Sequence, residues 1–155
     1  MIFATLIFVI FNFFDKNFLG DGGAYGLGFL LGFILVKISL SNYSISPYFV
    51  ANLLWYPAFE NLFSIMRRRF HKKNNYLPDN NHLHQLIFKY LRKKNFIKKN
   101  FLLSSIVGII INMYLFIVYL IGYFFYSETN VQVALILSSI ALYLLLYYRL
   151  AKTCR

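Results

Sequence analysis

The sequence predicts an all-α, polytopic integral membrane protein. Of its 155 residues, 59% are hydrophobic, 21% are aromatic and only 14% are charged, whereas about 25% of the residues of an ordinary soluble domain are charged. The charges are also unevenly distributed, since eleven of the sixteen Lys and Arg residues lie between Arg67 and Lys99. These observations exclude a disordered chain, and they predict a single membrane domain over residues 1–155.

Transmembrane helices need about 20 predominantly apolar residues, within a range of roughly 17 to 25. The segments that meet or approach this length are residues 24–40, 47–66, 101–126 and 131–148. A fifth apolar segment, residues 1–14, reaches only about 21 Å at ~1.5 Å per residue, which is less than the ~30 Å hydrocarbon core. It has neither the basic start nor the cleavage site of a signal peptide. We therefore expect about five membrane-spanning helices.

The basic residues predict the orientation of these helices, because short cytoplasmic loops are enriched in Lys and Arg. Residues 67–100 are therefore expected to form a cytoplasmic loop. Alternating the spans from this loop places residues 15–23 and 149–155 inside the cell and residues 41–46 and 127–130 outside. Neither outer loop contains Lys or Arg, and the net charge of +11 is concentrated inside. An anionic membrane surface fits this pattern better than a nucleic acid does.

The cytoplasmic loop is predicted to contain a short amphipathic helix after a turn-rich stretch at residues 74–81. The apolar positions recur at helical spacing, and they are Leu83, Leu86, Ile87, Tyr90 and Leu91. Lys89 and residues 92–94 fall on the other side. This pattern is typical of a helix lying on an anionic leaflet, with Asn80 or Asn81 as its N-cap. The alternative is a solvated basic loop that only sets the topology.

Asp21 is the first candidate for chemistry, because it lies between glycines. Six of the eight glycines fall in residues 20–32, and this run matches neither a P-loop nor a dinucleotide-binding motif. Close helix packing explains Gly28 and Gly32, but it does not explain a carboxylate between glycines. A flexible turn of this kind lets a phosphate or a hydrated metal ion approach closely. Asp21 is therefore the best-placed ligand for Mg²⁺ on the cytoplasmic side.

His82 and His84 form a second candidate cluster. Side chains at i and i+2 share a side only in an extended chain, so a common role requires both histidines at or before the start of the helix. A helix N-terminus beside Lys and Arg binds phosphate readily. The alternative is a pair of solvated loop histidines.

Glu60, inside an apolar segment, is interpreted as structural, since it can pair with a neighbouring helix. Cys154 is the only cysteine, which excludes an intrachain disulfide and a cysteine-based zinc cluster.

Three motifs in this order resemble the polyprenyl-phosphate N-acetylhexosamine-1-phosphate transferases, a family of membrane enzymes. Residues 18–23, Phe-Leu-Gly-Asp-Gly-Gly, are similar to the family's F-(L/M)-G-D-x-G-S loop. The stretch Leu-Trp-Tyr-Pro-Ala-Phe-Glu at residues 54–60 then runs into the arginines at 67–69. Residues 78–84, Pro-Asp-Asn-Asn-His-Leu-His, are similar to the cytoplasmic H-x-H segment of the family. The resemblance covers residues 11–91.

The resemblance implies a Mg²⁺-dependent phosphotransfer at the cytoplasmic face of a bacterial inner membrane. Polyprenyl phosphate would attack the sugar-linked phosphate of a UDP-N-acetylhexosamine, releasing UMP and forming a polyprenyl diphosphate sugar for cell-envelope polysaccharides such as O-antigen. The resemblance assigns the metal to Asp21 and contacts with the nucleotide sugar to His82 and His84. Asn81 and Arg68 are further candidates for substrate binding.

The chain also departs from the family. Ala24 stands where the glycine-rich loop usually has Ser, and the chain lacks the Asp-Asp pair that the family carries upstream of the glycine-flanked Asp. We therefore expect the C-terminal portion of such an enzyme, inactive alone, with an upstream N-terminal half as a partner. One alternative is a small non-catalytic membrane subunit that binds anionic lipid or a partner through its basic helix, in which Asp21, His82 and His84 are dispensable. The other alternative is a fragment of a transporter.

Overall fold

The computed structural model describes residues 2–14, 16–70, 81–94 and 100–153. Every regular element within these residues is an α-helix, so the expected all-α fold is confirmed for them. The chain divides into two compact units, Met1–Tyr43 and Ser44–Arg155. The predicted turn with Pro78 and Asp79, and the possible N-cap Asn80, lie outside the described residues.

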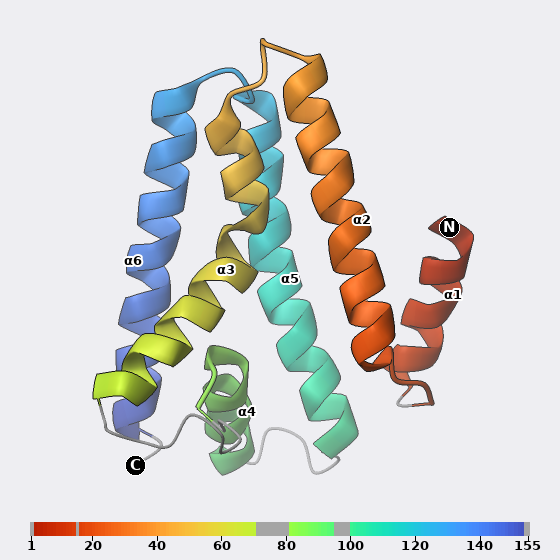
Figure 1. Ribbon diagram of the computed structural model, residues 1–155. Coiled ribbons are helices and arrows are strands. Elements are labelled where there is room, and N and C mark those ends of the chain that lie inside the picture. Colours follow the sequence, from red (N-terminus) through yellow and green to blue (C-terminus); the bar gives the residue numbers. More distant parts are fainter. Residues whose placement is uncertain (1, 15, 71–80, 95–99, 154–155) are drawn as a thin grey trace. The chain divides into compact units, whose positions relative to one another are not determined.

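The first unit consists of α1 (Ile2–Phe13) and α2 (Gly20–Ser41) (Figure 1). None of the residues of α2 is buried, and large apolar side chains such as Phe29, which is 79% exposed, line its surface. Such a surface is unfavourable in water but suited to lipid.

α2 begins at Gly20 and not near residue 24. The expectation that Asp21 lies in a flexible turn is therefore wrong, because Asp21 belongs to the first turn of this helix. The helix dipole favours a carboxylate at this position. Gly20 has a φ of +64°, a conformation that glycine adopts readily, so the change of chain direction takes place just before the Asp.

The second unit contains α3 (Pro47–Phe70), α4 (Leu83–Lys93), α5 (Asn100–Phe124) and α6 (Thr129–Thr153). α3 runs beside α5 and α6, and the short α4 packs against both α5 and α6 at one end of the unit (Figure 1). The short helix predicted in the cytoplasmic loop is therefore present as α4.

Aromatic rings hold α3 against α6. The centroid of the Phe63 ring lies 4.8 Å from that of Tyr147, and the centroid of the Phe59 ring lies 5.2 Å from that of Tyr143. Both contacts are edge-to-face, a geometry that contributes about 0.5–1.5 kcal/mol beyond the burial of area. α3 bends midway along its length (Figure 1), and Pro57 inside the helix explains the bend, because proline cannot complete the backbone hydrogen bonds.

Three of the described helices, α2, α5 and α6, are long and apolar enough to cross a membrane. They indicate a membrane protein. The predicted spans at residues 1–14 and 47–66 do not reach this criterion, because α1 has only 12 residues and α3 carries polar groups. These polar groups face inward: Asn52 and Ser64 are buried. Buried polar residues thus accompany a hydrophobic core, while many large apolar side chains are exposed on the surface.

Candidate functional site

α4 presents two different faces. Leu83 and Leu86 are only 5% and 4% exposed and belong to the core of the second unit, whereas Lys89, Arg92 and Lys93 are exposed. α4 is thus amphipathic, with its apolar residues buried and its basic residues exposed. Its apolar stripe is covered by the protein's own helices, and packing within the protein explains the stripe better than contact with a leaflet.

The start of α4 is fixed by a side chain from another helix. The backbone N–H of Leu83 donates a hydrogen bond to Oε1 of Glu60 at 2.9 Å, and the backbone N–H of His82 donates to Oε1 of Gln85 at 3.1 Å. His82 is the N-cap, with an extended backbone at φ −71° and ψ 155°. The predicted cap at Asn81 is therefore wrong. His82 and Gln85 form a local capping box, and Glu60 of α3 adds an acceptor from another helix.

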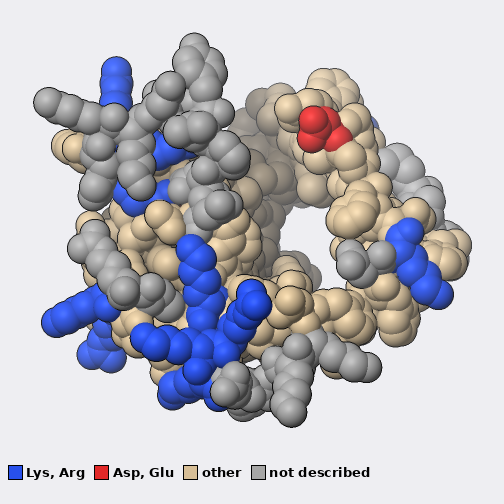
Figure 2. Space-filling view, turned by 90° about the horizontal axis from the view of Figure 1, so that it is seen from below, with Lys and Arg blue, Asp and Glu red and all other residues tan. Residues whose placement is uncertain are grey.

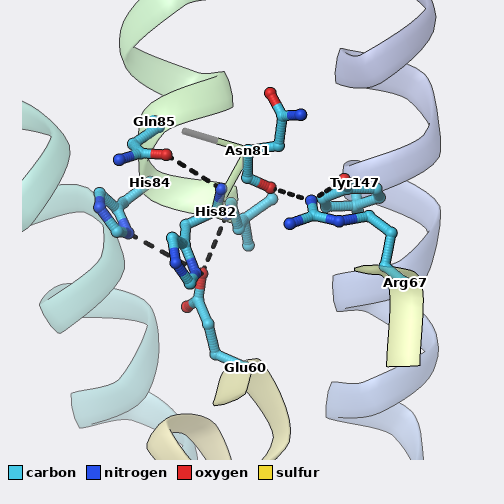
Figure 3. Close-up of polar contacts among 8 residues, drawn as sticks. Glu60, Arg67, Asn81, His82, His84, Gln85 and Tyr147 are labelled. Carbon is cyan, nitrogen blue, oxygen red and sulfur yellow. Dashed lines mark hydrogen bonds and ion pairs between the residues drawn. The ribbon is translucent and has the colours of Figure 1, made fainter. Parts of the chain in front are cut away.

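Glu60, His82 and His84 form a compact cluster at this helix start (Figure 3). Oε1 of Glu60 lies 3.4 Å from Nδ1 of His82 and 3.8 Å from Nδ1 of His84. The two imidazole rings are nearly parallel, with centroids 5.5 Å apart and planes inclined by 12°. Glu60 is buried, whereas the side chain of His84 is 51% exposed. The cluster therefore has a buried carboxylate at its base and opens to the surface through His84.

Arg67 links the segment before α4 to two other helices. Its Nη1 donates hydrogen bonds to the backbone oxygen of Asn81 and to the hydroxyl of Tyr147 (Figure 3). The guanidinium carbon lies 5.4 Å from the centroid of the Tyr147 ring, which is within the range of a cation–π interaction. The side chain of Asn81 in turn accepts a hydrogen bond from Nζ of Lys89 at 3.3 Å. These contacts place Asn81 beside the histidines.

The structure thus brings three of the five predicted site residues together, namely Asn81, His82 and His84. Arg68, the fourth, is half-buried at the end of α3. Asp21, the fifth, is exposed in the first unit. Among the residues that the structure describes, no group of three or more His, Cys, Asp or Glu side chains could hold a metal ion. Mg²⁺ often uses only one or two carboxylates together with substrate phosphates, so the exposed Asp21 fits a single ligand to this ion.

Two residues that contact this region, Glu60 and Tyr147, were not predicted as members of the site. Glu60 was interpreted as structural, although a signal was present, since it is a lone acidic residue in an apolar segment. Tyr147 carries no comparable signal, because it is one of 13 tyrosines in the chain.

Exposed basic side chains surround this end of the second unit (Figure 2). They are Arg69, Lys89, Arg92, Lys93, Lys94, Arg149 and Lys152. Nζ of Lys93 also donates a hydrogen bond to the backbone oxygen of Thr153 at 3.1 Å, which joins the end of α4 to the end of α6. A cluster of positive charges raises the local concentration of negatively charged ligands. This end of the unit therefore attracts anions.

A second polar cluster, which is neutral, lies where α3 begins, α5 ends and α6 begins. Nε2 of Gln132 donates hydrogen bonds to the backbone oxygens of Gly122 at 2.7 Å and Phe125 at 2.9 Å. Its Oε1 accepts a hydrogen bond from Nδ2 of Asn52 at 2.9 Å. Asn52 and Gln132 are fully buried. With no opening to the surface, this cluster holds three helices together.

Comparison with known proteins gave no match to any family model, curated protein or solved structure.

Proposed function

We propose that the chain is the C-terminal portion of a membrane glycosyl-1-phosphate transferase. Such an enzyme moves N-acetylhexosamine 1-phosphate from a UDP-sugar to polyprenyl phosphate in the synthesis of cell-envelope polysaccharides. The observation that carries the proposal is the pairing of His82 and His84 over the buried carboxylate of Glu60. Two solvated loop histidines have no need of a buried carboxylate that reaches them from another helix.

The surroundings of the histidine pair support this chemistry. Phosphoryl transfer depends mostly on positioning and on neutralisation of charge. The exposed Lys and Arg side chains attract the diphosphate of the nucleotide sugar, and Arg67 fixes the backbone of Asn81 next to His82. The resemblance assigns Mg²⁺ to Asp21, which belongs to the first unit, and this ion would supply charge neutralisation at phosphates. The half-exposed His84 is placed to contact the nucleotide sugar.

We also propose five membrane-spanning helices, with α1 and α3 added to the three candidate spans and with α4 in the cytoplasm. The absence of Lys and Arg from residues 41–46 and 127–130 supports this orientation. In a Cys154→Ser background, single cysteines at Ser127 and at the exposed Lys94 test it. An impermeant thiol reagent applied to intact cells should label the Ser127 position alone. Labelling of the Lys94 position in unbroken cells would reverse the orientation.

A small membrane subunit that binds anionic lipid without catalysis is the second candidate. The exposed basic side chains around α4 favour it (Figure 2), since Lys and Arg near an anionic leaflet contribute about 1 kcal/mol each. On this alternative, Asp21 and the two histidines are dispensable, whereas the basic side chains are required.

A complete enzyme, made by joining the chain to the upstream half of a transferase from the proposed family, distinguishes the two candidates. We expect Asp21→Asn to abolish transfer of sugar 1-phosphate, because this change removes the charge while it keeps the size. His82→Ala and His84→Ala should mainly raise the KM for the UDP-sugar. Lys93→Ala, one exposed charge among many, should change little.

The reverse pattern would favour the lipid-binding subunit. In that case Asp21→Asn retains near-normal transfer, while Lys93→Ala is as damaging as the histidine changes. The chain alone, supplied with UDP-N-acetylglucosamine, polyprenyl phosphate and Mg²⁺, should release no UMP above background. Turnover by the chain alone would contradict the proposal that an upstream half is required.

A further inference from the structure

Asn112 is a polar residue in the middle of an apolar helix. α5 is long and apolar enough to cross a membrane, and Asn112 lies twelve residues from each of its ends, Asn100 and Phe124. At ~1.5 Å per residue, it is about 18 Å from either end of the helix. The short side chain of an asparagine at the centre of a ~30 Å hydrocarbon core does not reach the polar headgroups.

The side chain of Asn112 faces away from the other helices of its unit. Val107 and Leu115 of α5 are buried, whereas Asn112 is exposed. Ile109 and Phe116, three residues before it and four residues after it, are 48% and 60% exposed. Residues at these spacings share one face of a helix. When α5 crosses a membrane, this face with Asn112 at its centre is therefore directed away from the bundle.

The helix itself uses only part of the hydrogen-bonding capacity of Asn112. Its Nδ2 donates a hydrogen bond to the backbone oxygen of Gly108 at 2.9 Å. A carboxamide has a second N–H and an oxygen with two lone pairs, and within the described part of the chain these groups of Asn112 have no hydrogen-bond partner. Acyl chains offer neither a donor nor an acceptor, so leaving these groups in lipid costs free energy.

A second copy of the chain supplies both missing partners. Two copies inserted in the same orientation can be related by a two-fold axis along the membrane normal, which brings equivalent residues to the same depth. A carboxamide is self-complementary, because the oxygen of one Asn112 can accept the N–H of the other and the reverse. The middle of α2 offers no such partner, since residues 26–36 contain no side chain with a hydrogen-bonding group.

We propose that the chain forms a parallel dimer in the membrane through α5, with the Asn112 side chains of the two copies hydrogen-bonded to each other. Ile109 and Phe116 flank this pair and pack across the interface. A single asparagine in an apolar contact between helices fixes their register and their number, and interhelical hydrogen bonds strengthen association in lipid. The pairing depends on α5 crossing the membrane and not on the transferase chemistry proposed above.

Energy transfer between labelled copies in lipid vesicles tests the dimer. The full chain carries a donor or an acceptor dye on Ser127→Cys in a Cys154→Ser background, and the ratio of protein to lipid is varied. We expect more transfer than randomly distributed chains give. Asn112→Leu should raise the dissociation constant of the dimer about tenfold, because it removes the interhelical hydrogen bonds. Asn112→Gln, which keeps the carboxamide, should retain most of the association.

Ser138→Leu is the matched control for Asn112→Leu. It also removes an exposed polar side chain from a candidate membrane span, α6, but the hydroxyl of Ser138 already donates to the backbone oxygen of Leu135 at 3.0 Å. The dissociation constant should therefore stay unchanged. Energy transfer at the random level in the chain with native Asn112, or an unchanged dissociation constant in Asn112→Leu, would overturn the proposal.

Disulfide cross-linking locates the contact without any change to Asn112. Ile109→Cys and Phe116→Cys, each in the Cys154→Ser background, should link two copies on oxidation in vesicles, because equivalent residues beside a two-fold axis come close together. Leu145→Cys, at a position of α6 that is 50% exposed, should remain monomeric. Cross-linking at the α6 position alone, or at neither α5 position, would overturn the interface. These variants retain Asn112, so this result does not depend on whether Asn112→Leu folds.

Discussion

The second unit has two polar clusters at opposite ends, and they are built in different ways. The cluster of Asn52 and Gln132 is neutral, fully buried and linked by hydrogen bonds to the backbone. The cluster of Glu60, His82 and His84 is charged at its base and open to the surface through a half-exposed ring.

This difference distinguishes polar residues that stabilise the fold of a membrane protein from polar residues that can bind a ligand. Polar groups inside a helical bundle are costly unless they are paired, and pairing is nearly complete around Gln132. At the other end, the half-exposed ring of His84 opens the cluster to the surface. We therefore expect substitutions in the Asn52–Gln132 cluster to change stability and substitutions in the Glu60–His82–His84 cluster to change binding.

The largest effect on stability should come from Gln132→Leu. This change removes three hydrogen bonds and leaves the buried amide of Asn52 without its acceptor. The free energy of unfolding, measured in mixed detergent micelles, should fall by about 3 kcal/mol. Ser138→Ala is the matched control on the exposed side of α6 and should stay within about 0.5 kcal/mol. Equal effects of the two changes would show that the buried cluster does not hold the bundle.

Two glycines on α5 test the same comparison, because Gly122 lies beside the buried cluster and Gly108 does not. A Cβ at Gly122 would lie 2.7 Å from Nδ2 of Asn52, whereas a Cβ at Gly108 meets nothing within 4 Å. Gly122→Ala should therefore lower the free energy of unfolding by about 1–3 kcal/mol. Gly108→Ala should raise it by up to about 1 kcal/mol through helix propensity. Stabilisation by both changes would mean that α3 is not packed closely against this part of α5.

The smallest of these effects should come from Arg67, which joins the end of α3 to the site. Arg67→Gln removes its contacts with Tyr147 and Asn81 and should cost about 1–2 kcal/mol. Because these contacts anchor the segment before α4, amide hydrogen exchange should increase mainly in α4. Arg69→Gln, an exposed neighbour, is the control. Uniform exchange across all helices of the unit would contradict a local role for Arg67.

Much of the fold could be predicted from the sequence, because helix length and apolar spacing are local properties. Long segments without charged residues predicted α5 and α6. The helical spacing of Leu83 and Leu86 predicted α4. The start of α2 could not be placed as well, since a run of glycines does not show which residue takes the positive φ. Asp21 consequently belongs to a helix and not to a turn.

The site could be predicted only in part, because its members come from distant segments. His82 and His84 were visible as a local pair. Their carboxylate, Glu60, lies 23 residues before Leu83, whose N–H it accepts, and Tyr147 lies 80 residues after Arg67. Pairings over such separations depend on how α3 bends at Pro57 and packs against α6. Local periodicity does not reveal them.

The most direct test of this account measures binding of UDP-N-acetylglucosamine and the free energy of unfolding in the same two variants, His84→Gln and Gln132→Leu. We predict that His84→Gln weakens the UDP-sugar at least tenfold and leaves the free energy of unfolding nearly unchanged. Gln132→Leu should reduce the free energy of unfolding, while the fraction that stays folded binds with unaltered affinity. Full affinity in His84→Gln, or loss of affinity in folded Gln132→Leu, would contradict the division of roles between the two clusters.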